Sequence, residues 1–113
     1  MLKQGRRTRK DIPKTPIFVS NPDACRRVLG ALSLVSSETR LKILCLLRDG
    51  DQCVTDLADA MGGKHSNVSQ QLKLLTLAGI LVRSRVQRRV VYRLADDRVR
   101  ALLEFLHERF GSV

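Results

Sequence analysis

The chain has 113 residues, which is enough for one domain with a single hydrophobic core. Its 21 Lys and Arg residues outnumber its 11 Asp and Glu residues and give a formal net charge of +10. A basic domain of this size most often binds a polyanion, and nucleic acid is the commonest one. The longest apolar run, Ile43 to Leu47, is too short to cross a membrane, and no apolar signal segment follows the basic N-terminus.

The cysteines indicate a reducing compartment. Cys25, Cys45 and Cys53 are odd in number and lack the dense spacing of a small secreted disulfide framework. The sequence therefore predicts a cytoplasmic protein with reduced thiols.

Residues 1–20 are predicted to form a flexible basic arm, because they are rich in Arg, Lys, Thr and Pro and lack a sustained apolar period. A first helix is expected from Asn21 to about Val35. Asn21 is a favourable N-cap, Pro22 suits the first helical position, and Asp23 complements the positive end of the helix dipole.

A second, buried helix is expected to end at Arg48, with Ser36 or Ser37 as its N-cap, because residues 40–48 are apolar around most of the helix. Residues 49–51 read as a turn. A short third helix follows from Val54 to Met61 and is broken by the glycine pair at 62–63.

The fourth predicted helix runs from about His65 to Ala78, with a buried stripe of Val68, Leu72 and Leu75. Two strands, Ile80 to Val86 and Arg89 to Leu94, follow with a tight turn between them. The last helix begins at Asp96-Asp97 and runs through Phe110. The fold class is therefore α+β, mostly helical, with five helices and a β-hairpin.

Two short helices joined at a glycine pair and followed by a basic hairpin match a winged helix-turn-helix. The fourth helix carries short hydrogen-bonding groups and one cation opposite its buried stripe, which suits the major groove. These predicted DNA-binding residues are His65, Ser66, Asn67, Ser69, Gln70 and Lys73. The hairpin adds cations for phosphates or the minor groove: Arg83, Arg85, Arg88 and Arg89. The plainer alternative is a solvated polar helix face beside a solvated hairpin.

Over residues 24–110 the chain resembles the ArsR/SmtB family of metal- and redox-responsive repressors. The motifs that carry the resemblance are Glu38–Leu44, Val54–Ala58, Ser66–Leu75, Ala78–Val82 and Val91–Leu94. The resemblance implies a homodimer in which the first and last helices of two chains pack together. It also implies that residues 21–113 form a DNA-binding and dimerisation domain whose operator affinity falls on binding an inducer or oxidising a thiol.

The metal sites of that family are not matched here. In the register of its zinc site, Asp96 fits, but Arg98 and Arg109 stand where histidines would be, and a guanidinium has no lone pair to donate. Its thiolate pattern is reduced to Cys53 and Asp56, with Thr55 at the second cysteine position. We therefore predict no metal and no cofactor. The sequence also shows no Ser-His-Asp, Cys-His or phosphate-cradling arrangement, so we predict no enzymatic activity.

Three sensing alternatives remain for the thiols. Cys45 lies at the family's redox position, so it is the first candidate, with Cys25 or Cys53 as its partner because Gly111 replaces the usual one. Cys25 and Cys53 of opposite chains could instead hold trivalent arsenic. All three cysteines could also be plain core residues with no inducer.

The leading prediction is a homodimeric repressor of a near-palindromic operator, bound to double-stranded DNA and not to a membrane. One alternative is an architectural protein that binds nucleic acid through charge alone. The other is a winged-helix module that binds another protein.

Overall fold

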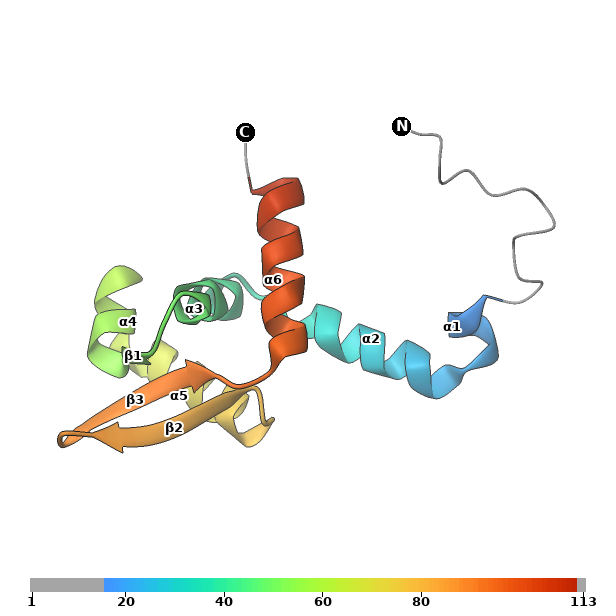
Figure 1. Cartoon of the computed structure of the whole chain (residues 1–113). Coiled ribbons are helices and arrows are strands. Elements are labelled where there is room, and N and C mark those ends of the chain that lie inside the picture. The colour runs from blue at the N-terminus through green and yellow to red at the C-terminus, as the bar shows by residue number, and fades with distance from the viewer. Residues whose placement is uncertain (1–15, 112–113) are drawn as a thin grey trace. The chain divides into compact units, whose positions relative to one another are not determined.

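The computed structural model describes residues 16–111, so most of the basic arm predicted over residues 1–20 lies outside the described residues. Within this range the elements follow in the order α1 (Ile17–Ser20), α2 (Pro22–Leu34), α3 (Glu38–Arg48), β1 (Gln52–Cys53), α4 (Val54–Ala60), α5 (His65–Leu77), β2 (Leu81–Val86), β3 (Arg89–Leu94) and α6 (Asp97–Phe110) (Figure 1). The chain divides into two compact units, one ending at Leu32 and one beginning at Ser33, and each is described by itself.

The N-terminal unit contains α1 and most of α2. As predicted, Asn21 caps α2: its Oδ1 accepts a hydrogen bond from the Ala24 backbone N–H at 3.1 Å. Helix α2 ends at Leu34, one residue before the predicted limit. The one-turn helix α1 is a correction to the predicted arm, since Pro16 O accepts hydrogen bonds from the Val19 and Ser20 backbone N–H groups.

The core of the second unit is aliphatic and centres on α3. The Ser37 hydroxyl caps α3 by accepting from the Arg40 backbone N–H at 3.3 Å, as the sequence predicts. The side chains that are 2 % exposed or less and form its centre are Ile43, Leu44, Leu47, Leu57, Ala58, Val68, Leu72, Leu75, Leu81 and Leu103. Burying such side chains is the main source of stability in a domain this small.

Helices α4 and α5 form the helix-turn-helix around the predicted glycine break. Gly62 and Gly63 both have positive φ, 92° and 85°, which residues with a side chain rarely adopt. The turn lets α5 lay the predicted stripe of Val68, Leu72 and Leu75 against the core, where none is more than 2 % exposed.

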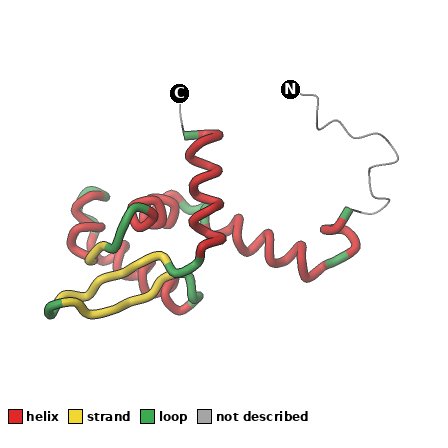
Figure 2. Tube along the Cα trace, in the orientation of Figure 1, coloured by secondary structure: helices red, strands yellow, loops and turns green. Residues whose placement is uncertain are grey.

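Over the described residues the sheet has one more strand than predicted. Strand β1, whose residues belong to no element predicted from the sequence, pairs antiparallel with β3 through Gln52↔Tyr92 and Cys53↔Val91. The strand order is β1-β3-β2, so the hairpin has one partnered edge and one open edge, β2. Figure 2 shows the two long strands meeting at a tight turn at their far end.

Helix α6 closes the second unit. The Asp96 carboxylate caps this helix by accepting a hydrogen bond from the Arg98 backbone N–H at 2.9 Å. The side of α6 that faces the core carries the buried residues Val99 and Leu103. The Arg100 guanidinium donates to the carbonyls of Arg48 and Leu94, which ties α6 to the ends of α3 and β3. Among residues 16–111, no helix is long and apolar enough to cross a membrane.

Candidate nucleic-acid interface

Helix α5 presents the predicted polar face to solvent. The residues of this face and of its start, all exposed, are His65, Ser66, Asn67, Ser69, Gln70 and Lys73. They lie opposite a stripe that is fully buried, so the rotation of α5 about its own axis is fixed by packing. A helix fixed in this way can hold side chains at defined positions in a major groove.

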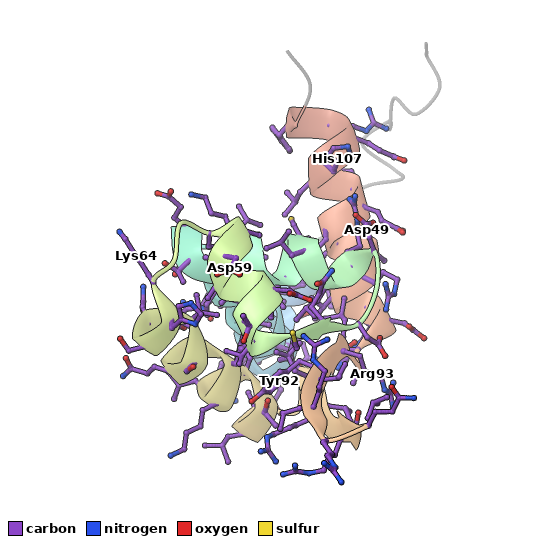
Figure 3. All side chains as sticks on the ribbon, turned by 90° about the vertical axis from the view of Figure 1, so that its left-hand side faces the viewer. Asp49, Asp59, Lys64, Tyr92, Arg93 and His107 are labelled. Atoms are coloured by element: carbon purple, nitrogen blue, oxygen red, sulfur yellow. The ribbon has the colours of Figure 1, made fainter. Side chains whose placement is uncertain are left out.

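The start of α5 is positioned by α4. Lys64 is its N-cap, and the His65 Nε2 atom lies 3.6 Å from the Asp59 carboxylate of α4. Figure 3 shows Lys64 at the start of α5 and Asp59 on the neighbouring helix. The two residues lie on either side of the turn between α4 and α5. Both side chains are more than half exposed, so solvent strongly weakens their electrostatic attraction.

The wing arginines divide between the two faces of the hairpin. Cross-strand pairs share a face, and the register pairs Arg83 with Tyr92 and Arg85 with Val90. We call this the core face, because Leu81 and Leu94, which also share it, are buried in the core. The outer face carries Arg89 and Arg93. Figure 3 shows Tyr92 turned toward the helices and Arg93 projecting outward.

Arg89, one of the arginines predicted to bind DNA, has a partner inside the protein. Its Nη2 atom donates to the Cys53 Sγ atom at 3.1 Å, which ties the start of β3 to β1. Arg93, on the same face and exposed, is absent from the predicted DNA-binding set. The alternation of side chains along a strand places Arg93 on the same face as Arg89, since Arg89, Val91 and Arg93 are spaced two residues apart.

The turn between β2 and β3 is a two-residue turn in which both central residues, Gln87 and Arg88, have positive φ, 50° and 73°. These angles match a type I′ turn, which usually carries Asn-Gly. The sequence leaves the turn type open because no glycine is present. An arginine at the tip keeps a cation there at the cost of backbone strain.

We therefore expect the double change Gln87→Asn, Arg88→Gly to raise the free energy of unfolding by about 1 kcal/mol, because it relieves left-handed strain. Urea denaturation measures this change. Arg88→Gln is the control, since it removes the charge and leaves most of the strain. A double variant less stable than the unaltered chain would contradict the strained-turn description.

The thiols lie in three different surroundings. Cys45 is half-buried and lines a cavity of about 510 Å³ between α3, α4 and α6, which Asp49 and His107 also line. Cys53 is buried and lines a separate hollow together with Asp51, Asp56 and residues of the β2–β3 hairpin, which forms the wing. Cys25 belongs to the N-terminal unit. Burial raises the pKa of the Cys45 thiol, with Asp49 adding to the rise and Arg48 opposing it.

The residues in the register of the family's zinc site have other partners: Asp96 and Arg98 bind each other, and Arg109 lies against Phe105. The Asp96 carboxylate accepts from the Arg98 guanidinium at 2.9 and 3.1 Å, and this hydrogen bond lowers the pKa of Asp96. Arg109 lies with its guanidinium carbon 5.8 Å from the centre of the Phe105 ring. In the part of the chain that the structure describes, no three His, Cys, Asp or Glu side chains gather as a metal site.

Residues 37–82 match the family model of bacterial regulatory proteins of the arsR family, which spans the helix-turn-helix. The regulator NmtR of Mycobacterium tuberculosis is 39% identical over 81% of this chain and 74% of its own length. This chain belongs to the arsR family. The CadC homologue of Staphylococcus aureus, a cadmium resistance regulatory protein, is 35% identical over 91% of this chain and 81% of its own length.

The fold agrees with solved structures of the same family. The repressor BigR from Xylella fastidiosa superimposes with a TM-score of 0.75 and 26% identity, covering 83% of this chain and 96% of that one. The arsR-family chain is therefore a winged-helix DNA-binding regulator of transcription. The exposed face of α5 and the basic β2–β3 hairpin are the candidate surfaces for such binding.

Proposed function

We propose that this arsR-family protein is a transcriptional repressor that binds a near-palindromic operator as a homodimer in the cytoplasm, with a regulatory and not a catalytic role. The proposal rests chiefly on one observation: from His65 to Lys73, α5 exposes polar side chains opposite a stripe that is no more than 2 % exposed. The residues proposed to bind bases and phosphates are His65, Ser66, Asn67, Ser69, Gln70, Lys73, Arg83, Arg85, Arg88 and Arg89.

Competition at rising salt tests this proposal against an architectural role. Phosphate-only binding weakens alike on every duplex as salt rises, whereas base contacts preserve a preference for one sequence. The experiment selects a duplex from a random pool and compares it with a scrambled duplex of equal composition. Equal affinities at every salt concentration would favour the architectural role, and no binding at moderate salt would favour a protein-binding module.

The dimer is proposed from apolar side chains left in solvent on two helices. In the N-terminal unit, α2 exposes Val28, Leu29 and Leu32, the last at 48 %. In the second unit, α6 exposes Phe105 at 52 % and Phe110 at 75 %. Several large apolar side chains exposed along one helix are typical of an interface with another chain.

We expect sedimentation at micromolar concentration to give a homodimer at both 50 mM and 300 mM salt, because burial of apolar area depends little on salt. The variant Phe105→Asp should shift the protein toward monomer, while Glu104→Asp, one residue away and exposed, should not. A monomer at both salt concentrations would remove the dimer from the proposal.

For induction we propose thiol modification of Cys45, with Cys25 or Cys53 as the second thiol. The cavity beside Cys45 gives a reagent access to its sulfur, and α3 carries that sulfur close to the core that supports α5. A disulfide or persulfide there would displace α3 and with it the recognition helices. Trivalent arsenic held by Cys25 and Cys53 of two chains is the second candidate.

We expect polysulfide or diamide to lower operator affinity, and Cys45→Ser to abolish the effect. The raised pKa keeps Cys45 protonated at neutral pH, so its rate of modification should climb with pH until the thiol ionises. Operator affinity measured for the reduced, oxidised and arsenite-treated protein decides between the candidates. Unchanged affinity after all treatments would leave the cysteines as core residues.

A further inference from the structure

Arg40 joins three segments of the second unit. It lies in the first turn of α3, and its Nη2 and Nε atoms donate to the carbonyls of Ser33 and Leu34 at 3.0 and 3.3 Å. Its Nη1 atom donates to the Gln71 Oε1 atom of α5 at 3.5 Å. One half-buried guanidinium therefore contacts both the end of α2 and the middle of α5.

The chemistry of this junction requires arginine. The last carbonyls of a helix have no partners within the helix, and a cation there also complements the negative end of the helix dipole. A planar guanidinium can donate to two adjacent carbonyls and still present a third N–H group to another element. A lysine ammonium keeps the charge but has no rigid fork to hold three acceptors in these directions.

The contact with α5 is made at a sensitive position. Gln71 is half-buried and follows Gln70, which is exposed and proposed to read a base. Leu72, the next residue, is fully buried. Because consecutive residues on a helix point about 100° apart, a bond that holds Gln71 also limits the direction in which Gln70 points.

We propose that Arg40 is a positioning residue for operator recognition: the buried stripe of α5 sets its rotation coarsely, and Arg40, by holding Gln71 against α3, adjusts that rotation and so the placement of Gln70, without touching a base. The inference rests on the proposed role of α5 as the recognition helix. If so, operator specificity depends on a residue outside the helix-turn-helix formed by α4 and α5. That residue, Arg40, lies on α3, and its side chain is anchored to the end of α2.

The test is a double-mutant cycle with Arg40→Lys and Gln71→Met, which keep the charge of the first and the approximate volume of the second. We expect each variant to lose about threefold to tenfold in operator affinity, and the double variant to lose no more than the worse single one, because they break the same bond. Affinity for a scrambled duplex at the same salt should stay within twofold. Urea denaturation shows that each variant is folded.

Arg100→Lys is the matched control, because Arg100 is also half-buried and donates to two backbone carbonyls, those of Arg48 and Leu94. It should lower stability without changing the ratio of operator to scrambled affinity. An unchanged ratio for Arg40→Lys and Gln71→Met would overturn the inference, as would fully additive losses. If Gln70→Ala also leaves base preference unchanged, the recognition-helix assignment fails instead, and the inference fails with it.

Discussion

Replacing Gln70 by alanine is expected to weaken operator binding by about 1–3 kcal/mol and to relax the base preference at one position in each half-site. Gln70 is exposed on α5, where a side-chain amide can donate to and accept from one adenine. Alanine removes both hydrogen bonds and leaves a strong helix former in place. Binding to a set of duplexes that differ at single positions measures the change.

Leu77→Ala is the control for this prediction. Leu77 lies about two turns further along α5 on the same side and is 76 % exposed, so its truncation should change stability little. Recognition helices contact bases mainly through their N-terminal residues, so Leu77 should not affect base preference. Equal effects of the two substitutions, or no effect of Gln70→Ala, would show that another surface reads the operator.

The helices were predictable because their signals are local. The stripe of Val68, Leu72 and Leu75 has the helical period, and Asn21, Ser37 and Asp96 are capping residues whose side chains accept hydrogen bonds from backbone N–H groups two or three residues further along the chain. Each signal lies within a few residues of the feature that it predicts. The arsR family followed from the same segments read together.

The features that the sequence did not reveal depend on interactions between distant residues. Strand β1 exists only because Gln52 and Cys53 pair with β3 about forty residues later, and a two-residue strand has no period of its own. The bonds from Arg89 to Cys53 and from Arg40 to Gln71 likewise join residues far apart in the chain. The positive φ values of Gln87 and Arg88 arise from strand pairing and not from their own preference.

The residues of α5 predicted to bind DNA are all exposed, and for the hairpin the prediction did not distinguish its two faces. All the arginines of the hairpin read alike as cations, whereas the register assigns Arg83 and Arg85 to the core face and Arg89 to the outer face. Helix α5 packs against β2, the open edge of the sheet, and β1 lies along β3 at the other edge. Arg83 and Arg85 are therefore on the strand next to α5, the proposed recognition helix.

Neutralising this pair is expected to have the second large effect. The double change Arg83→Gln, Arg85→Gln should weaken binding to every duplex by about 1–3 kcal/mol, because it removes charge-assisted hydrogen bonds to phosphates and none to bases. It should also reduce the slope of log affinity against log salt concentration. The slope should fall by about 1 for each phosphate that the variant no longer neutralises, counted over the hairpins of both subunits of the proposed dimer. Titrations of operator and scrambled duplex between 50 and 200 mM salt, the range over which such effects are large, measure both.

Arg89→Gln together with Arg93→Gln is the matched control, since it removes the same charge from the same hairpin on the opposite face. Arg89 is already bonded to Cys53, so its replacement should change the salt dependence less and the stability of the β1–β3 pairing more. Equal reductions of affinity and slope in the two double variants would mean that the wing acts only through its total charge. A larger reduction from the outer pair would place Arg89 and Arg93, and not Arg83 and Arg85, against the phosphates.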